Sequence, residues 1–89
     1  SDFALYRLAE HASLGNPAVC KFSRFRAEQK INGIAIDADI ILYYGYPIPE
    51  VFTELRKAIS YEIETWTTLN IHSITLTAKS LVMPEKERR

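Results

Sequence analysis

This chain has few of the residues that mark secreted, phosphate-binding or membrane-spanning proteins. It holds one cysteine, Cys20, so no intrachain disulfide can form, and this usage fits a reducing compartment. Its three glycines are scattered, so there is no glycine-rich loop to hold a phosphate. No apolar run is long enough to span a bilayer, and we expect no signal peptide. We therefore expect a cytoplasmic protein without a membrane span.

The sequence also lacks an excess of charge of either sign. Lys plus Arg and Asp plus Glu each number 11, so the formal net charge is zero. Nucleic-acid-binding domains usually carry a basic excess, because phosphate neutralisation drives their affinity. Nucleic acid is therefore an unlikely partner, although a local basic face remains compatible with this balance. A net charge near zero also does little to prevent self-association.

The length and composition indicate one globular domain. The chain has 89 residues, of which 47% are hydrophobic and 25% charged. A single hydrophobic core serves chains of this size. We expect one domain over residues 1–83, followed by a charged C-terminal tail over residues 84–89.

Two segments have the periodicity of amphipathic helices. The first ends at Gly15-Asn16-Pro17 and places apolar residues at helical spacing: Leu5, Leu8, Ala9 and Ala12. The second begins near Pro47 and Pro49, which suit a first helical turn. Its apolar stripe predicts a helix of roughly 18–20 residues with Trp66 in the core; the stripe is Ile48, Val51, Phe52, Leu55, Ala58, Ile59, Ile63 and Trp66.

Three segments have the alternation of strands. Residues 19–31 alternate imperfectly, which predicts a strand with a bulge or a late start, and Asn32-Gly33 predicts a type I′ hairpin turn. Residues 34–44 alternate cleanly, with Asp37 and Asp39 on one face and apolar residues on the other: Ile34, Ile36, Ala38, Ile40, Leu42 and Tyr44. Residues 69–83 predict the last strand.

The predicted order is α-β-β-α-β. Two strands form a hairpin, and the long helix crosses over to a third strand, which we expect to run parallel to the second. The fold class is therefore α+β, a two-layer sandwich with a three-stranded sheet and the helices on one face. The sequence leaves open which hairpin strand neighbours the last one.

No combination of residues indicates catalysis or metal binding. His11, His72 and Cys20 lie far apart in the sequence, and Cys20 is expected to be a buried or half-buried small hydrophobe. Asp37 and Asp39 share a strand face and could form a cation site or an acid/base pair. The favoured interpretation is a solvated sheet face, on which they pair with Arg24, Arg26 or Lys30. We expect no enzyme activity, no catalytic residue, no cofactor and no metal.

Two groups of residues are candidates for binding. Tyr43, Tyr44 and Tyr46 cluster before Ile48, and exposed aromatic residues mark protein interfaces. Arg24 and Arg26 alternate with Phe22 and Phe25, a pattern that also occurs on nucleic-acid-binding strands. The candidate interaction surface is therefore Tyr43, Tyr46, Ile48, Arg24 and Arg26, and nucleic-acid binding by the Arg24/Arg26 strand is the alternative function.

One motif connects the strand that ends in tyrosines to the long helix. It reads Tyr44-Gly45, then Ile48-Pro49-Glu50-Val51, and the helix is followed by Thr68-Leu69 and an alternating strand. The segment 35–82 that contains it resembles the alkaline shock protein family of Gram-positive bacteria, also known as the Gls general-stress family. Residues 8–22 are similar to the family's first helix and its exit. Where the family has Thr-Gly before the last strand, this chain has Thr67-Thr68.

The resemblance implies a small, cytoplasmic, non-enzymatic protein tied to cell-envelope homeostasis and to alkaline or general stress. It also implies protein partners: some members are brought to the membrane by a partner protein, and some self-assemble. The expected partners are thus a small membrane-anchored protein and further copies of the chain. The family has no accepted catalytic residues, so the resemblance assigns none.

Overall fold

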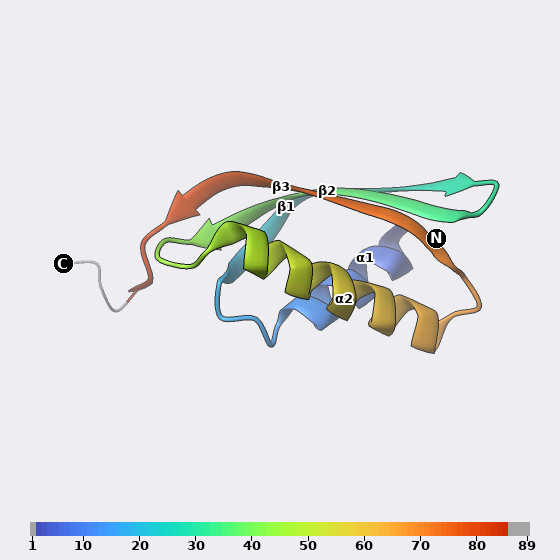
Figure 1. Cartoon of the computed structure of the whole chain (residues 1–89), viewed down its shortest axis with the longest axis horizontal. Helices are drawn as coiled ribbons and strands as arrows, with labels where there is room; N and C mark the ends of the chain where they lie inside the picture. Colours follow the sequence, from blue (N-terminus) through green and yellow to red (C-terminus); the bar gives the residue numbers. More distant parts are fainter. Residues whose placement is uncertain (1, 86–89) are drawn as a thin grey trace.

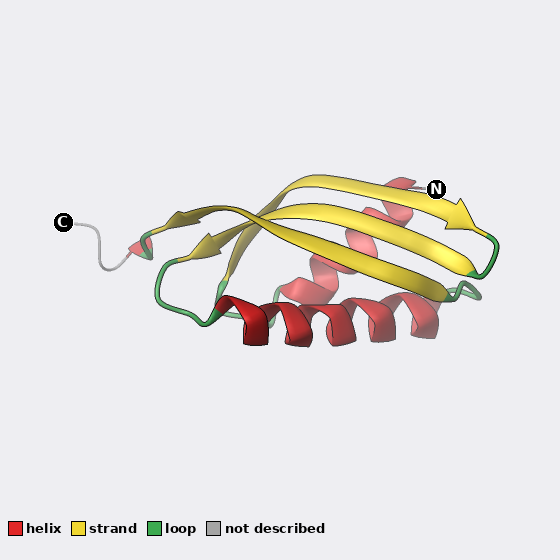
Figure 2. Ribbon diagram, turned by 45° about the horizontal axis from the view of Figure 1, so that its top comes forward, coloured by secondary structure: helices red, strands yellow, loops and turns green. Residues whose placement is uncertain are grey.

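The chain forms one three-stranded sheet with both helices on the same side of it (Figure 1). This computed structural model describes residues 2–85, so residues 86–89 of the expected tail lie outside it. The order α-β-β-α-β is as predicted, and its elements are α1 Asp2–Ser13, β1 Val19–Lys30, β2 Gly33–Tyr43, α2 Ile48–Trp66 and β3 Ile71–Val82. The α+β class and the two-layer arrangement are confirmed (Figure 2).

The strand order, which the sequence left open, is β1-β2-β3. β1 pairs antiparallel with β2, as the hairpin requires, and β3 pairs parallel with β2 on its other side. The parallel pairing confirms the predicted crossover through α2. β2 is therefore the central strand, and both β1 and β3 are edge strands.

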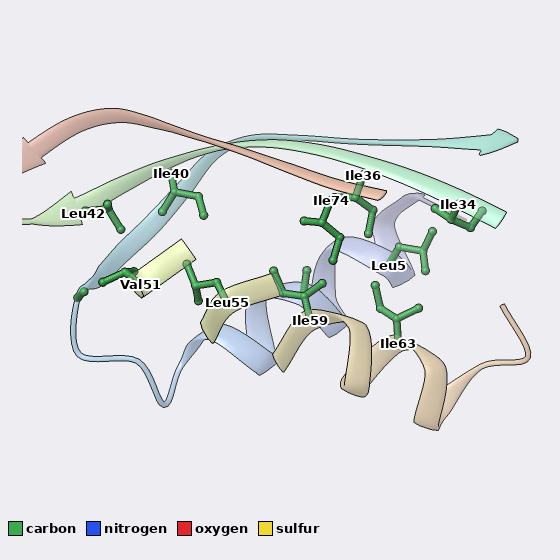
Figure 3. Close-up of a cluster of buried hydrophobic side chains, with 12 residues drawn as sticks. Leu5, Ile34, Ile36, Ile40, Leu42, Val51, Leu55, Ile59, Ile63 and Ile74 are labelled. Carbon is green, nitrogen blue, oxygen red and sulfur yellow. The ribbon is translucent and has the colours of Figure 1, made fainter. Parts of the chain in front are cut away.

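The core lies between β2 and the two helices. The predicted inward face of β2 is buried at every position from Ile34 to Leu42, whereas Tyr44, which was expected to continue that face, lies beyond the strand and is 63% exposed. α2 contributes one buried residue per turn, at Val51, Leu55, Ile59 and Ile63, and α1 contributes Leu5 and Ala9. These side chains point into the same space between sheet and helices (Figure 3).

Two register shifts explain the imperfect alternation of β1. They lie between Val19 and Lys21 and between Phe22 and Arg24, so the predicted bulge is confirmed. Because of them, Phe22 and Phe25 both pair with inward residues of β2, Ile40 and Ala38. Their rings stack at 6.1 Å, and the Tyr6 ring of α1 meets that of Phe25 edge-on at 5.7 Å.

The hairpin forms, but not with the predicted type I′ turn. Lys30 pairs with Gly33, so Ile31 and Asn32 make the connection, and no described non-glycine residue has a positive φ. Gly33 itself has φ 138°, and a Cβ atom there would lie 2.6 Å from the Asn70 carbonyl oxygen. Glycine is needed here because the segment leading into β3 passes so close to its backbone.

α2 ends without a glycine, because hydrogen bonds made by Thr67 terminate the helix. The Thr67 amide and hydroxyl both donate to the Ile63 carbonyl, at 3.0 and 2.7 Å, and its hydroxyl accepts the Leu69 amide at 3.0 Å. This explains how Thr67-Thr68 can replace Thr-Gly. The predicted burial of Trp66 is wrong: its side chain is 70% exposed, because it lies in the last turn, beyond Ile63, the last buried residue of the stripe.

Candidate interaction surface

The turn between β2 and α2 is fixed to the rest of the molecule through its backbone. The Tyr43 amide donates to the Ala18 carbonyl at 2.8 Å, and the Tyr44 amide donates to the Val82 carbonyl at 2.7 Å. Gly45 turns the chain with φ 106°, and the Val51 amide donates to the Pro47 carbonyl as α2 begins. The tyrosines therefore project from a backbone that three elements hold in place.

The side chains around this turn surround an open hollow. The hollow has a volume of about 330 Å³ and is lined by Pro17, Tyr43, Tyr46, Pro84 and Glu85. Tyr44 and Tyr46 are 63% and 40% exposed, and Leu81 and Met83, on either side of Val82, are 45% and 44% exposed. We call the surface formed by Pro17, Tyr43, Tyr46, Pro84 and Glu85 the aromatic end.

The five residues predicted from the sequence as an interaction surface do not lie together in the structure. Tyr43 and Tyr46 lie together at the aromatic end. Ile48 is half-buried against the core, so it supports this end from within. Pro17 and Pro84 were not predicted, because only the pairing of β1 and β3 with β2 brings the ends of these distant segments beside the tyrosines.

Arg24 and Arg26 lie on the face of the sheet that the helices do not cover, which we call the open face. The Arg24 guanidinium donates to both carboxylate oxygens of Asp39, at 3.0 and 3.3 Å, and lies 3.0 Å from the Asp37 carboxylate. The predicted pairing across the hairpin is thus confirmed for Arg24. Arg26 pairs in register with Asp37, and its side chain is exposed.

The contact between Arg24 and Asp39 shifts the pKa of both groups. The hydrogen bonds to Arg24 hold the pKa of Asp39 below its ordinary value, and the bonds to Asp39, then Asp37, raise the pKa of Arg24. The Asp39 carboxylate is therefore ionised at neutral pH and engaged by a permanent cation. Asp39 thus lacks the raised pKa of a general acid, and the carboxylates of Asp37 and Asp39 already have Arg24 as their cation.

The residues that suggested nucleic-acid binding meet beside α1. Phe22 and Phe25 stack with each other, and with Arg24 they line an open hollow of about 390 Å³ that Phe3 and Tyr6 of α1 complete. Arg24 is already paired with two carboxylates. The arginine at this hollow is therefore accompanied by its own counter-charges, whereas a site for single-stranded nucleic acid combines aromatic rings with a positively charged groove.

The histidines and the cysteine remain apart. His11 lies 2.9 Å from the Glu62 carboxylate and connects the two helices, whereas His72 is exposed on β3. Cys20 is exposed, so its expected burial is wrong; it lies at the first register shift of β1. Across residues 2–85, no group of three or more potential metal ligands gathers.

The alkaline shock protein 23 family, described as having a cell envelope-related function, matches residues 25–83. The chain belongs to this family. The match includes the second half of β1, both other strands and α2, together with the strand-to-helix turn that carries the resemblance. No curated protein matches the chain.

Solved structures share the fold of this family member at low sequence identity. A variant of the MamM CTD is similar with a TM-score of 0.70 and 18% identity, covering 88% of this chain and 93% of that one. A copper form has a TM-score of 0.69, 17% identity and coverage of 88% and 95%. A nickel form has a TM-score of 0.70, 18% identity and coverage of 88% and 96%. The likeness concerns the fold alone.

The helices were also considered as membrane spans. Within the part of the chain that the structure describes, neither α1 nor α2 combines the length and the apolarity that crossing a bilayer demands.

Proposed function

We propose that this domain is a non-enzymatic interaction or scaffold protein that serves cell-envelope homeostasis or the response to alkaline or general stress. It acts by self-association or by docking to a membrane-linked partner. Membership of the alkaline shock protein 23 family, with its cell envelope-related function, supports the envelope link. The residues considered for catalysis or metal binding support a non-enzymatic role. Asp37 and Asp39 are paired with Arg24, and His11 is paired with Glu62.

The aromatic end is the observation that carries the proposal. Tyrosine offers a large contact area with few rotatable bonds, and exposed aromatic residues are enriched at protein interfaces. Here the rings of Tyr43 and Tyr46, together with two prolines and Glu85, line a hollow of about 330 Å³. A partner's apolar side chain entering this hollow would bury rings that now face water.

The test compares the native protein with Tyr46→Ser. Self-association is measured by sedimentation velocity over a wide concentration range at two salt concentrations, and docking by retrieval of a partner from a Gram-positive membrane extract. Tyr46→Ser should weaken docking to the retrieved partner at least about tenfold, since a central interface tyrosine typically contributes that much.

The matched control is Tyr61→Ser, because Tyr61 is a similarly exposed tyrosine, at 72%, on the solvent side of α2. It should leave both measurements unchanged. A native protein that stays monomeric at every concentration and retrieves no envelope protein would overturn the proposed function. Equal behaviour of the two variants would instead remove the aromatic end from it.

A further inference from the structure

The two edges of the sheet differ in a way that bears on self-association. β1 carries five charged residues among its 12 and is interrupted by two register shifts; the charges are Lys21, Arg24, Arg26, Glu28 and Lys30. Charges and bulges are how proteins prevent edge strands from pairing with other chains. β1 is therefore a protected edge.

β3 also has two register shifts, so the edges differ in charge: β3 lacks the charged residues that protect β1. It is also 12 residues long, but Lys79 is its only Lys, Arg, Asp or Glu, and it contains no proline. Its register shifts lie near the ends, so Ser73–Ala78 pairs regularly with β2. The Glu64 carboxylate accepts the Ile71 amide at 2.9 Å, so the available edge begins after Ile71. Within residues 2–85, no strand covers its outer side.

The side chains of this segment suit a second copy of the same strand. Its open face carries hydroxyls, at Ser73, Thr75 and Thr77, and its helix-facing side carries Ile74, Leu76 and Ala78. Leu76 and Ala78 remain half-buried, because they lie at the margin of the core. A strand added at this edge would cover them.

We propose that two copies of the chain pair antiparallel along their β3 edges, in the register that places Thr75 opposite Thr75. This inference deepens the self-association part of the proposed function and rests on it, while assigning that contact to a surface other than the aromatic end. The two helix layers then lie on one side of a continuous six-stranded sheet.

The register follows from the alternation of the strand. A two-fold axis at Thr75 places Ser73 opposite Thr77 on the open face and Ile74 opposite Leu76 on the helix-facing side. Cross-strand hydroxyl pairs and apolar pairs are both favourable, whereas a shift of one residue would set hydroxyls against apolar side chains. The two Lys79 residues lie at opposite ends of the paired segment, so their charges do not meet.

Cysteine crosslinking tests this register directly. In a Cys20→Ser background, Thr75→Cys should form a disulfide-linked dimer under mild oxidation, because opposite Cβ atoms in such a pair lie about 5 Å apart. Thr77→Cys is the matched control: in this register its two thiols are offset by about 13 Å, beyond disulfide reach. Thr75→Cys should therefore crosslink at least about tenfold faster, and Thr77→Cys should crosslink instead with Ser73→Cys.

A second variant tests the edge without any thiol. Thr75→Lys sets two like charges against each other on the axis and should weaken dimerisation at least about tenfold by sedimentation velocity. Gln29→Lys, on the protected β1 edge, should leave the dimer intact. Circular dichroism verifies that each variant remains folded.

The outcomes separate this inference from the proposed function. Equal crosslinking of Thr75→Cys and Thr77→Cys, or a dimer unaffected by Thr75→Lys, overturns pairing at β3. If Tyr46→Ser still abolishes partner docking or assembly in that case, the proposed function stands without it. A strictly monomeric native protein that nonetheless retrieves a membrane partner also overturns the inference alone.

Discussion

On one face of β2, the side chains from Ile34 to Leu42 are buried beneath the helices; on the other, Asp37 and Asp39 meet Arg24 in contact with water. Both faces belong to one strand, because successive residues point to opposite sides. Burial of apolar surface stabilises the first face, whereas exposed ion pairs contribute little to stability. The fold therefore depends on the covered face, and the open face can change its chemistry without unfolding the domain.

The largest loss of stability is expected for Ile40→Ala, on the covered face. Ile40 has no exposed surface, so its truncation should lower the free energy of unfolding by about 2–5 kcal/mol. Urea denaturation monitored by circular dichroism measures the change. The adjacent Ile41→Ala, on the open face and only half-buried, is the control and should cost clearly less. Equal losses would mean that the open face is covered in solution.

A smaller effect is expected for Arg24→Met, which removes the cation shared by Asp37 and Asp39 while keeping an unbranched side chain. The urea midpoint at neutral pH should fall slightly, well short of the Ile40→Ala change, because these groups are screened by water. Arg26→Met provides the comparison, since Arg26 makes no ion pair with any residue in the described range. A loss as large as that from a core truncation would contradict the contrast between the faces.

The smallest expected effect is a change in acid sensitivity. Because the folded-state pKa of Asp39 is lowered by Arg24, the stabilisation is present above the ordinary carboxyl pKa and is lost as the pH falls through the folded-state value. Urea midpoints measured from about pH 7 to about pH 2 should therefore decline less steeply in Arg24→Met than in the native protein. Parallel declines would show that Asp39 is not linked to folding through Arg24.

Much of the fold could be predicted because local patterns and burial agree. The strict alternation of β2 and the apolar stripe of α2 each determined an element and its buried side. The two wrong predictions of burial concern residues whose exposure depends on packing between distant elements. Trp66 continues the apolar stripe of α2 but is exposed in its last turn, and Cys20 is exposed at a register shift of β1.

The candidate surfaces were predicted less completely. The tyrosines were visible as a cluster in the sequence, but Pro17 and Pro84 join them only because three separate segments meet at the same place. Arg24 and Arg26 looked alike in sequence, whereas the structure gives Arg24 two carboxylates. The register across the hairpin places each arginine opposite one aspartate, so the distinction comes from the Arg24 side chain, which reaches both carboxylates.

The sequence by itself determined the elements, their order, the buried faces and the family, because periodicity and the Tyr44–Val51 motif are local properties of the chain. Only the tertiary structure decided the strand order, the burial of individual side chains and the composition of the aromatic end. It also decided which edge of the sheet is protected. These properties depend on contacts between residues far apart in the chain, and local spacing contains no information about them.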